Sequence, residues 1–129
     1  MQRRVLPAFL ALAALSACAT EAERRHPAVV FFTEDSAALD DEARQVIAQV
    51  AERARARPLS PVIIRGFAAP DTGTASYNRT LSETRARQVA DALVQAGVGQ
   101  GRIRIEPRGA VPFELMAMEA RRVEIVFGP

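Results

Sequence analysis

An arginine stands on the apolar face of the most regular helical segment in this chain. Residues 78–97 are rich in Ala, Leu, Arg, Glu and Gln and contain neither Gly nor Pro before Gly97. This composition predicts a helix that ends at Gly97. At about 100° per residue, one stripe of that helix collects Asn78, Leu81, Arg85, Val89, Ala92, Leu93 and Ala96. The stripe should face the core, so Arg85 is predicted to be buried.

A buried guanidinium needs a partner, because it stays protonated and its burial costs several kcal/mol unless a carboxylate or several acceptors meet it. One candidate is an internal carboxylate, since the chain has fifteen Asp and Glu residues. The other is a ligand carboxylate. Arg85 lies in the N-terminal half of the helix, where free N-H groups and the helix dipole also attract negative charge. Spacing alone leaves both alternatives open.

Catalytic chemistry and nucleic-acid binding are both poorly supported. The only His, His26, has no Cys, Asp or second His at metal-ligand spacing, and we find no Ser/His/Asp set. We therefore expect neither an enzyme nor a metal or other cofactor. All seventeen basic residues are Arg, and Arg3 and Arg4 account for the net charge of +2. The rest of the chain has equal numbers of basic and acidic residues, which argues against a nucleic-acid partner.

The first residues have the features of an export signal. Two arginines precede an apolar run at 5–15, which is too short to span a bilayer as a helix. The run ends in Leu-Ser-Ala-Cys, with the only Cys of the chain at Cys18. This box resembles the lipobox of bacterial lipoproteins, whose leader is cut before a lipidated Cys. An ordinary secretory signal cut after Ala17 or Ala19 is the alternative.

The chain thus divides into three parts. Residues 1–17 are predicted to be a lipoprotein signal peptide, and 18–27 the lipidated Cys with a short polar tether. Residues 28–129 are long enough for one domain with a modest core. By resemblance to enterobacterial lipoproteins, the absence of Asp at position 19 favours an anchor in the outer membrane of a Gram-negative envelope, facing the periplasm.

Six elements are expected in this domain. The strands are predicted at 28–32, 61–66, 102–107 and 122–127, and the helices at 41–57, capped by Asp40, and 78–97. The order β-α-β-α-β-β predicts a two-layer α/β sandwich, with two helices on one face of a small mixed sheet. A polar loop at 67–73 joins a strand to a helix, a common place for an anion site in α/β proteins.

Several short motifs resemble the C-terminal domain shared by OmpA, Pal and MotB. They are Tyr77-Asn78, Leu81-Ser82, Arg85-Ala86, Val89, Leu93 and Gly97 in the second helix, and Arg121-Arg122-Val123-Glu124-Ile125 at the last strand. The resemblance covers nearly all of residues 28–127 and implies an OmpA-like fold. It also implies a non-catalytic protein that binds the diaminopimelate residue of the peptidoglycan stem peptide.

The resemblance implies the site residues as well. Arg85 matches the arginine that meets the diaminopimelate carboxylate, while Leu81 and Ser82 match residues that line the ligand. The full expected set is Asp71, Asn78, Leu81, Ser82, Arg85, Arg121 and Arg122. Asn78 matches a residue that orders the loop, and the two final arginines match a pair near the same site.

The chain departs from the family at the acidic residue after the second strand. Between Gly66 and Asn78 it is one residue longer than usual, and Pro70 stands where counting back from Gly73 places the family Asp. Either a shifted turn brings Asp71 into the site or the ammonium-binding half is lost. The alternative function is a degenerate scaffold for envelope proteins. It is favoured by a loop with four exposed-looking apolar residues, Phe113, Leu115, Met116 and Met118.

Overall fold

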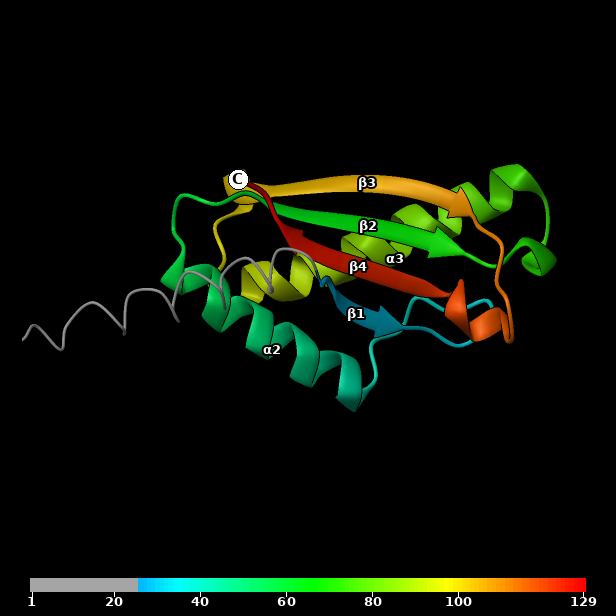
Figure 1. Cartoon of the computed structure of the whole chain (residues 1–129), viewed down its shortest axis with the longest axis horizontal. Helices are drawn as coiled ribbons and strands as arrows, with labels where there is room; N and C mark the ends of the chain where they lie inside the picture. Colours follow the sequence, from blue (N-terminus) through cyan, green and yellow to red (C-terminus); the bar gives the residue numbers. More distant parts are fainter. Residues whose placement is uncertain (1–25) are drawn as a thin grey trace, which may run out of the picture.

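The computed structural model describes residues 26–129 (Figure 1). The predicted signal peptide and the predicted lipidation at Cys18 lie outside the described residues. The strands are β1 (Ala28–Phe31), β2 (Val62–Ala68), β3 (Ile103–Ala110) and β4 (Arg122–Phe127). The α-helices are α2 (Asp41–Ala56) and α3 (Ala75–Gln95), and the short 3-10 helices are η1 (Pro70–Thr72), η2 (Gln100–Arg102) and η3 (Ala117–Glu119).

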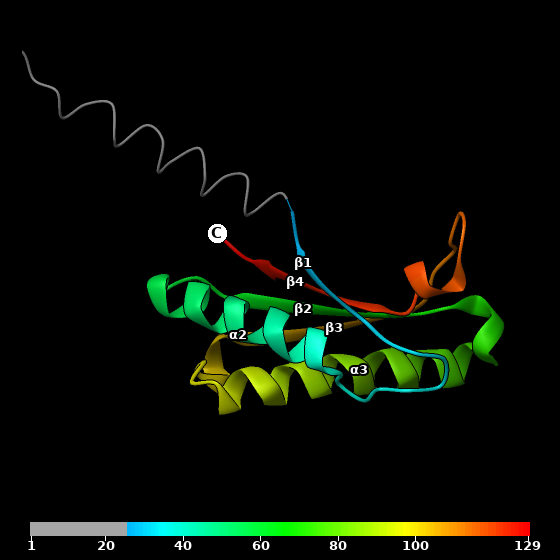
Figure 2. The ribbon, with the colours of Figure 1, turned by 90° about the horizontal axis from the view of Figure 1, so that it is seen from below.

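The four strands form one mixed sheet in the order β1-β4-β2-β3. β4 is antiparallel to both β1 and β2, whereas β2 and β3 are parallel. The two α-helices of residues 26–129, α2 and α3, cover the same face of the sheet (Figure 2). The predicted β-α-β-α-β-β order and two-layer sandwich are confirmed. No helix within residues 26–129 combines the length and apolarity needed to cross a bilayer.

The helix boundaries follow from capping. Asp40 accepts a hydrogen bond from the Ala43 N-H at 2.7 Å and begins α2 as predicted. The predicted start of α3 at residue 78 is wrong, because Thr74 accepts from the Tyr77 N-H at 3.1 Å and begins the helix at Ala75.

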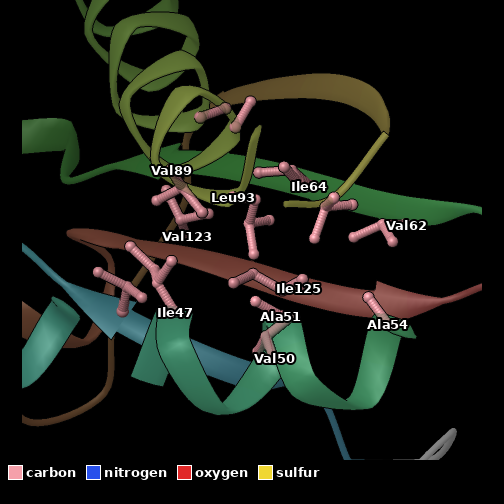
Figure 3. Packing of buried hydrophobic residues seen from close by; sticks show 14 of the residues in the cluster. Ile47, Val50, Ala51, Ala54, Val62, Ile64, Val89, Leu93, Val123 and Ile125 are labelled. Atoms are coloured by element: carbon pink, nitrogen blue, oxygen red, sulfur yellow. The ribbon is translucent and has the colours of Figure 1, made fainter. Parts of the chain in front are cut away.

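The core lies between the helices and the sheet. Side chains from α2, α3, β2 and β4 point toward one another in Figure 3. The labelled residues are Ile47, Val50, Ala51, Ala54, Val62, Ile64, Val89, Leu93, Val123 and Ile125. In β4 alternate residues are buried, as the sequence pattern predicted. Fully burying one such Val, Leu or Ile contributes about 1.5 to 3 kcal/mol.

Gly66 sets how closely α3 approaches the sheet. A Cβ atom at this position would lie 1.9 Å from the backbone oxygen of Ser82, so no larger residue fits while α3 stays in place. β2 and β3 are also longer than predicted, because they stay paired beyond a bulge at Gly66/Phe67. The first half of α3 consequently packs against the carboxyl end of β2.

Candidate functional site

Arg85 is fully buried, as its place on the apolar stripe predicted. Its Nε donates to the Ser36 carbonyl at 2.8 Å, and its two terminal nitrogens donate to the carbonyls of Phe67 and Thr33, each at 3.1 Å. No Asp or Glu among residues 26–129 forms an ion pair with it. The internal carboxylate considered from the sequence is therefore absent here, and backbone acceptors replace it.

The surroundings of Arg85 disfavour its charge. Burial, together with the nearby cation of Arg121, lowers the pKa of the guanidinium well below its ordinary value, to about 10. Opposing contributions come from Tyr77 and Asp35. The guanidinium carbon also lies 5.3 Å from the centre of the Phe32 ring. A second positive charge so close makes this end of the domain attractive to an anion.

Arg121 is the more accessible of the two cations. Its side chain is 15% exposed, and one terminal nitrogen lies 3.8 Å from an Asp71 oxygen and 3.9 Å from a Glu34 oxygen. No hydrogen bond accompanies either ion pair, and the Arg121 Nε is buried without a hydrogen-bond partner in the described part of the chain. Such loose pairs with exposed carboxylates are weak. A ligand carboxylate could displace them.

Asp71 lies beside Arg121, a position that the sequence left open. It lies in η1, between the end of β2 and the start of α3, and its nearest charge partner is Arg121. A carboxylate at this position could also receive a ligand ammonium. Cations and carboxylates therefore lie together at one end of the domain, an arrangement that suits a zwitterionic ligand.

Tyr77 and Asp35 form a second polar contact at the same end. The Tyr77 hydroxyl donates to an Asp35 carboxylate oxygen at 2.9 Å. This hydrogen bond raises the pKa of the Tyr77 phenol above 10.0. The sequence assigned no ligand-binding role to Tyr77, Asp35 or Glu34, and the adjacent acids Glu34 and Asp35, just after the first predicted strand, were the available signal.

Three predicted site residues are buried, and their contacts are with the protein itself. The Asn78 amide donates to the Gly73 carbonyl at 3.4 Å, which ties α3 to the preceding loop. The Ser82 hydroxyl donates to the Arg79 carbonyl at 2.7 Å and accepts from the Gly109 N-H at 3.0 Å. Leu81 is also buried. None of these three presents its side chain openly to a ligand.

Arg122 does not join Arg121. Adjacent residues on a strand point to opposite faces, and Val123, the next residue in β4, is in the core. Arg122 instead lies on the face of the sheet opposite α2 and α3, with its guanidinium carbon 4.3 Å from the centre of the Phe67 ring. It also donates to Glu124 at 3.1 Å and to the Glu119 carbonyl at 2.7 Å. The predicted pairing of both arginines at one site is therefore wrong.

The loop between β3 and β4 displays apolar side chains, as expected. Leu115 is 85% exposed, and Phe113, Met116 and Met118 are also exposed. The Glu119 carboxylate accepts three backbone N-H bonds, from Glu114 at 3.2 Å and from Leu115 and Met116 at 3.3 Å each. One carboxylate thus orders the loop. In the described part of the chain, no three His, Cys, Asp or Glu side chains come together in a way that could hold a metal ion.

Sequence comparison finds relatives among outer membrane proteins. Residues 31–116 match the OmpA family. Outer membrane protein 40 of Porphyromonas gingivalis is 40% identical over 82 residues, covering 64% of this chain and 21% of that protein. Outer membrane protein A of Bordetella avium is 42% identical over 79 residues, covering 61% of this chain and 40% of that protein. The chain thus matches less than half the length of either relative.

Solved structures share the fold. The peptidoglycan-associated lipoprotein of Burkholderia pseudomallei superposes with a TM-score of 0.72 at 28% identity, covering 77% of this chain and 88% of that one. The C-terminal domain of Helicobacter pylori MotB gives a TM-score of 0.70 at 23% identity, covering 81% and 84%. These similarities bear out the fold expected from the sequence.

Proposed function

The chain belongs to the OmpA family, and we propose that it binds peptidoglycan without cleaving it. The observation that carries the proposal is the pair of neighbouring cations, Arg85 and Arg121, at the end of the domain where Asp71 and Glu34 also lie. The similarity to a peptidoglycan-associated lipoprotein supports it. The function is that of a tether between envelope and cell wall.

The ligand we propose is the diaminopimelate residue of the stem peptide, which carries an ammonium and a carboxylate on one centre. Its carboxylate would displace the loose ion pairs of Arg121, with the buried charge of Arg85 behind it. Its ammonium would pair with Asp71. Asn78, Leu81 and Ser82 would support this site through packing. Arg122 has no part in it, because it lies on the other face of the sheet.

The anchor completes the proposal. Lipidation at Cys18 would attach the protein to the outer membrane at its periplasmic face, and residues 18–27 would form a short connection to the domain. Two or more acyl chains hold a protein firmly, whereas one chain gives only marginal membrane binding. The similarity to outer membrane proteins supports an envelope location.

Retention on purified sacculi tests the proposal. Arg121→Gln should weaken retention by about 30-fold, since truncating a charge in a charge pair costs about 2 kcal/mol or more. Arg122→Gln is the matched control, with the same chemistry one residue away on the other face, and should bind like the wild type. Equal retention of the two variants would overturn the assignment of the site.

Asp71→Asn separates ligand binding from stability. Thr74 caps α3, so the substitution should leave the melting temperature nearly unchanged. Retention on sacculi should fall, because an amide cannot neutralise the ligand ammonium. Unchanged retention would remove Asp71 from the site.

A second candidate function is a protein-interaction scaffold that does not bind peptidoglycan. The ordered, exposed apolar loop that contains Leu115 and Met116 favours it, since surface patches of this kind mark interaction sites. Under this alternative the wild type itself would not be retained on sacculi. The retention assay therefore distinguishes the two functions before any variant is compared.

A further inference from the structure

The sheet has one edge that can accept another strand. Within residues 26–129, β1 pairs only with β4, and the Phe32 N-H donates to the Arg121 carbonyl at 2.8 Å. In an antiparallel ladder, alternate residues turn their backbone groups to the same side. Phe32 and Val30 therefore face β4, whereas Val29 and Phe31 turn their N-H and C=O groups to the free edge.

The two edges of the sheet differ in their protection. Natural edge strands carry charged side chains and prolines, which prevent unwanted pairing with other strands. The other edge strand, β3, has both, with Arg104, Pro107 and Arg108. β1 reads Ala-Val-Val-Phe and has neither, and its Phe31 side chain is 47% exposed. The unprotected edge is the one formed by β1.

A groove runs along this edge. It consists of two hollows of about 440 and 250 Å³ that share Val29 and Val46, and we call it the β1 groove. Val46 and Val50 of α2 line it on the helix side. α2 extends beyond β1 when the sheet is seen face on (Figure 1), and it lies in the helix layer in the perpendicular view (Figure 2).

The position of α2 decides what can fill the β1 groove. A new strand would lie about 4.8 Å outside β1, directly over α2. A second copy of this domain, paired through its own β1, would bring its own α2 into the space that α2 already occupies. The groove therefore suits one extended peptide segment and not another whole domain.

The charges at the two ends of the β1 groove favour one chain direction for the bound segment. Arg53 lines the β1 groove near Ala28, whereas Asp40 and Glu42 line it near Phe31. Antiparallel pairing places the C-terminal end of the added segment near Arg53. We propose that the β1 groove binds an extended peptide of a partner protein by antiparallel strand addition. That segment has small or β-branched residues toward α2, an acidic residue at its C-terminal end and a basic residue at its N-terminal end.

Two synthetic peptides test this inference on the full ¹⁵N-labelled chain. The first is acetyl-Arg-Thr-Val-Thr-Val-Glu-amide, and the second has Arg and Glu exchanged. The first should shift the amide signals of Val29 and Phe31 and slow their hydrogen exchange by about tenfold or more. The second should bind about fivefold more weakly, a ratio in the range of exposed ion pairs. With Arg53→Glu the preference should shrink or reverse.

A proline variant provides the decisive control. Val29→Pro removes a donor on the free edge without touching the ladder to β4, and it should abolish peptide binding. Val29→Thr keeps the N-H and the branched shape and should bind normally. Equal binding by the two variants, or signal changes confined to other elements, would overturn the proposal. So would full protection of the Val29 and Phe31 amides before peptide is added, because the edge would then already be occupied.

Discussion

Replacing Arg85 with Ala should destabilise the fold itself, whatever the ligand. The guanidinium joins three carbonyls that are far apart in the sequence, those of Thr33 and Ser36 after β1 and that of Phe67 in β2. Ala would leave these acceptors without their donor. The loop after β1 would lose its attachment to α3.

The magnitude follows from two opposing contributions. Each buried acceptor left without a donor costs about 1 to 3 kcal/mol, or roughly 6 kcal/mol for three carbonyls in the middle of that range. Removing the buried charge offsets part of this loss of stability, because the variant no longer keeps a guanidinium charged in the protein interior. A pKa lowered from the ordinary arginine value to about 10 corresponds to about 3 kcal/mol in favour of losing the charge. We therefore expect a net loss of about 3 kcal/mol from a total of typically 5 to 15 kcal/mol.

Urea unfolding followed by far-UV circular dichroism measures this loss. Arg87→Ala is the matched control, because Arg87 is on the same helix but exposed, with an i,i+4 ion pair to Glu83 at 2.7 Å. It should cost about 0.5 kcal/mol or less. Arg85→Lys should restore only part of the stability, since an ammonium cannot reach three acceptors as the planar fork does. A loss for Arg85→Ala no larger than that of Arg87→Ala would refute the reasoning.

Three further predictions concern other parts of the chain. Gly66→Ala should cost about 3 kcal/mol in the same urea assay, because its Cβ would overlap the backbone of α3, whereas Gly101→Ala, with open space around it, should change little. The phenol of Tyr77, the only Tyr in a chain without Trp, should titrate above pH 10.0 by ultraviolet absorbance. Asp35→Asn should bring the pKa of the Tyr77 phenol back toward its ordinary value. An unchanged titration would exclude the hydrogen bond between Tyr77 and Asp35 in solution. Metabolic labelling with a fatty-acid analogue should mark the wild type but not Cys18→Ser, and labelling that survives the substitution would exclude lipidation at this residue.

The regular elements were largely predictable from local patterns. Periodicity predicted that Arg85 lies on the buried stripe and that alternate residues of β4 are buried, and capping chemistry predicted Asp40 at the start of α2. These features depend on residues a few positions apart, so they can be read directly. The start of α3 was also readable, since Thr74 is a favourable capping residue. The strand period of two also carried the separation of Arg121 from Arg122, although the family resemblance had placed the two arginines together.

Tertiary structure alone decided what surrounds Arg85. Its three acceptors lie 18, 49 and 52 residues away in sequence. They are backbone carbonyls, which every residue of the chain has, so residue type does not identify them. The strand order β1-β4-β2-β3 brings the end of β1, the end of β2 and the start of β4 to one place. Glu34, Asp71 and Arg121 meet there for that reason. Local spacing predicted that a buried cation needs acceptors, but only the long-range pairing of strands determined which acceptors meet it.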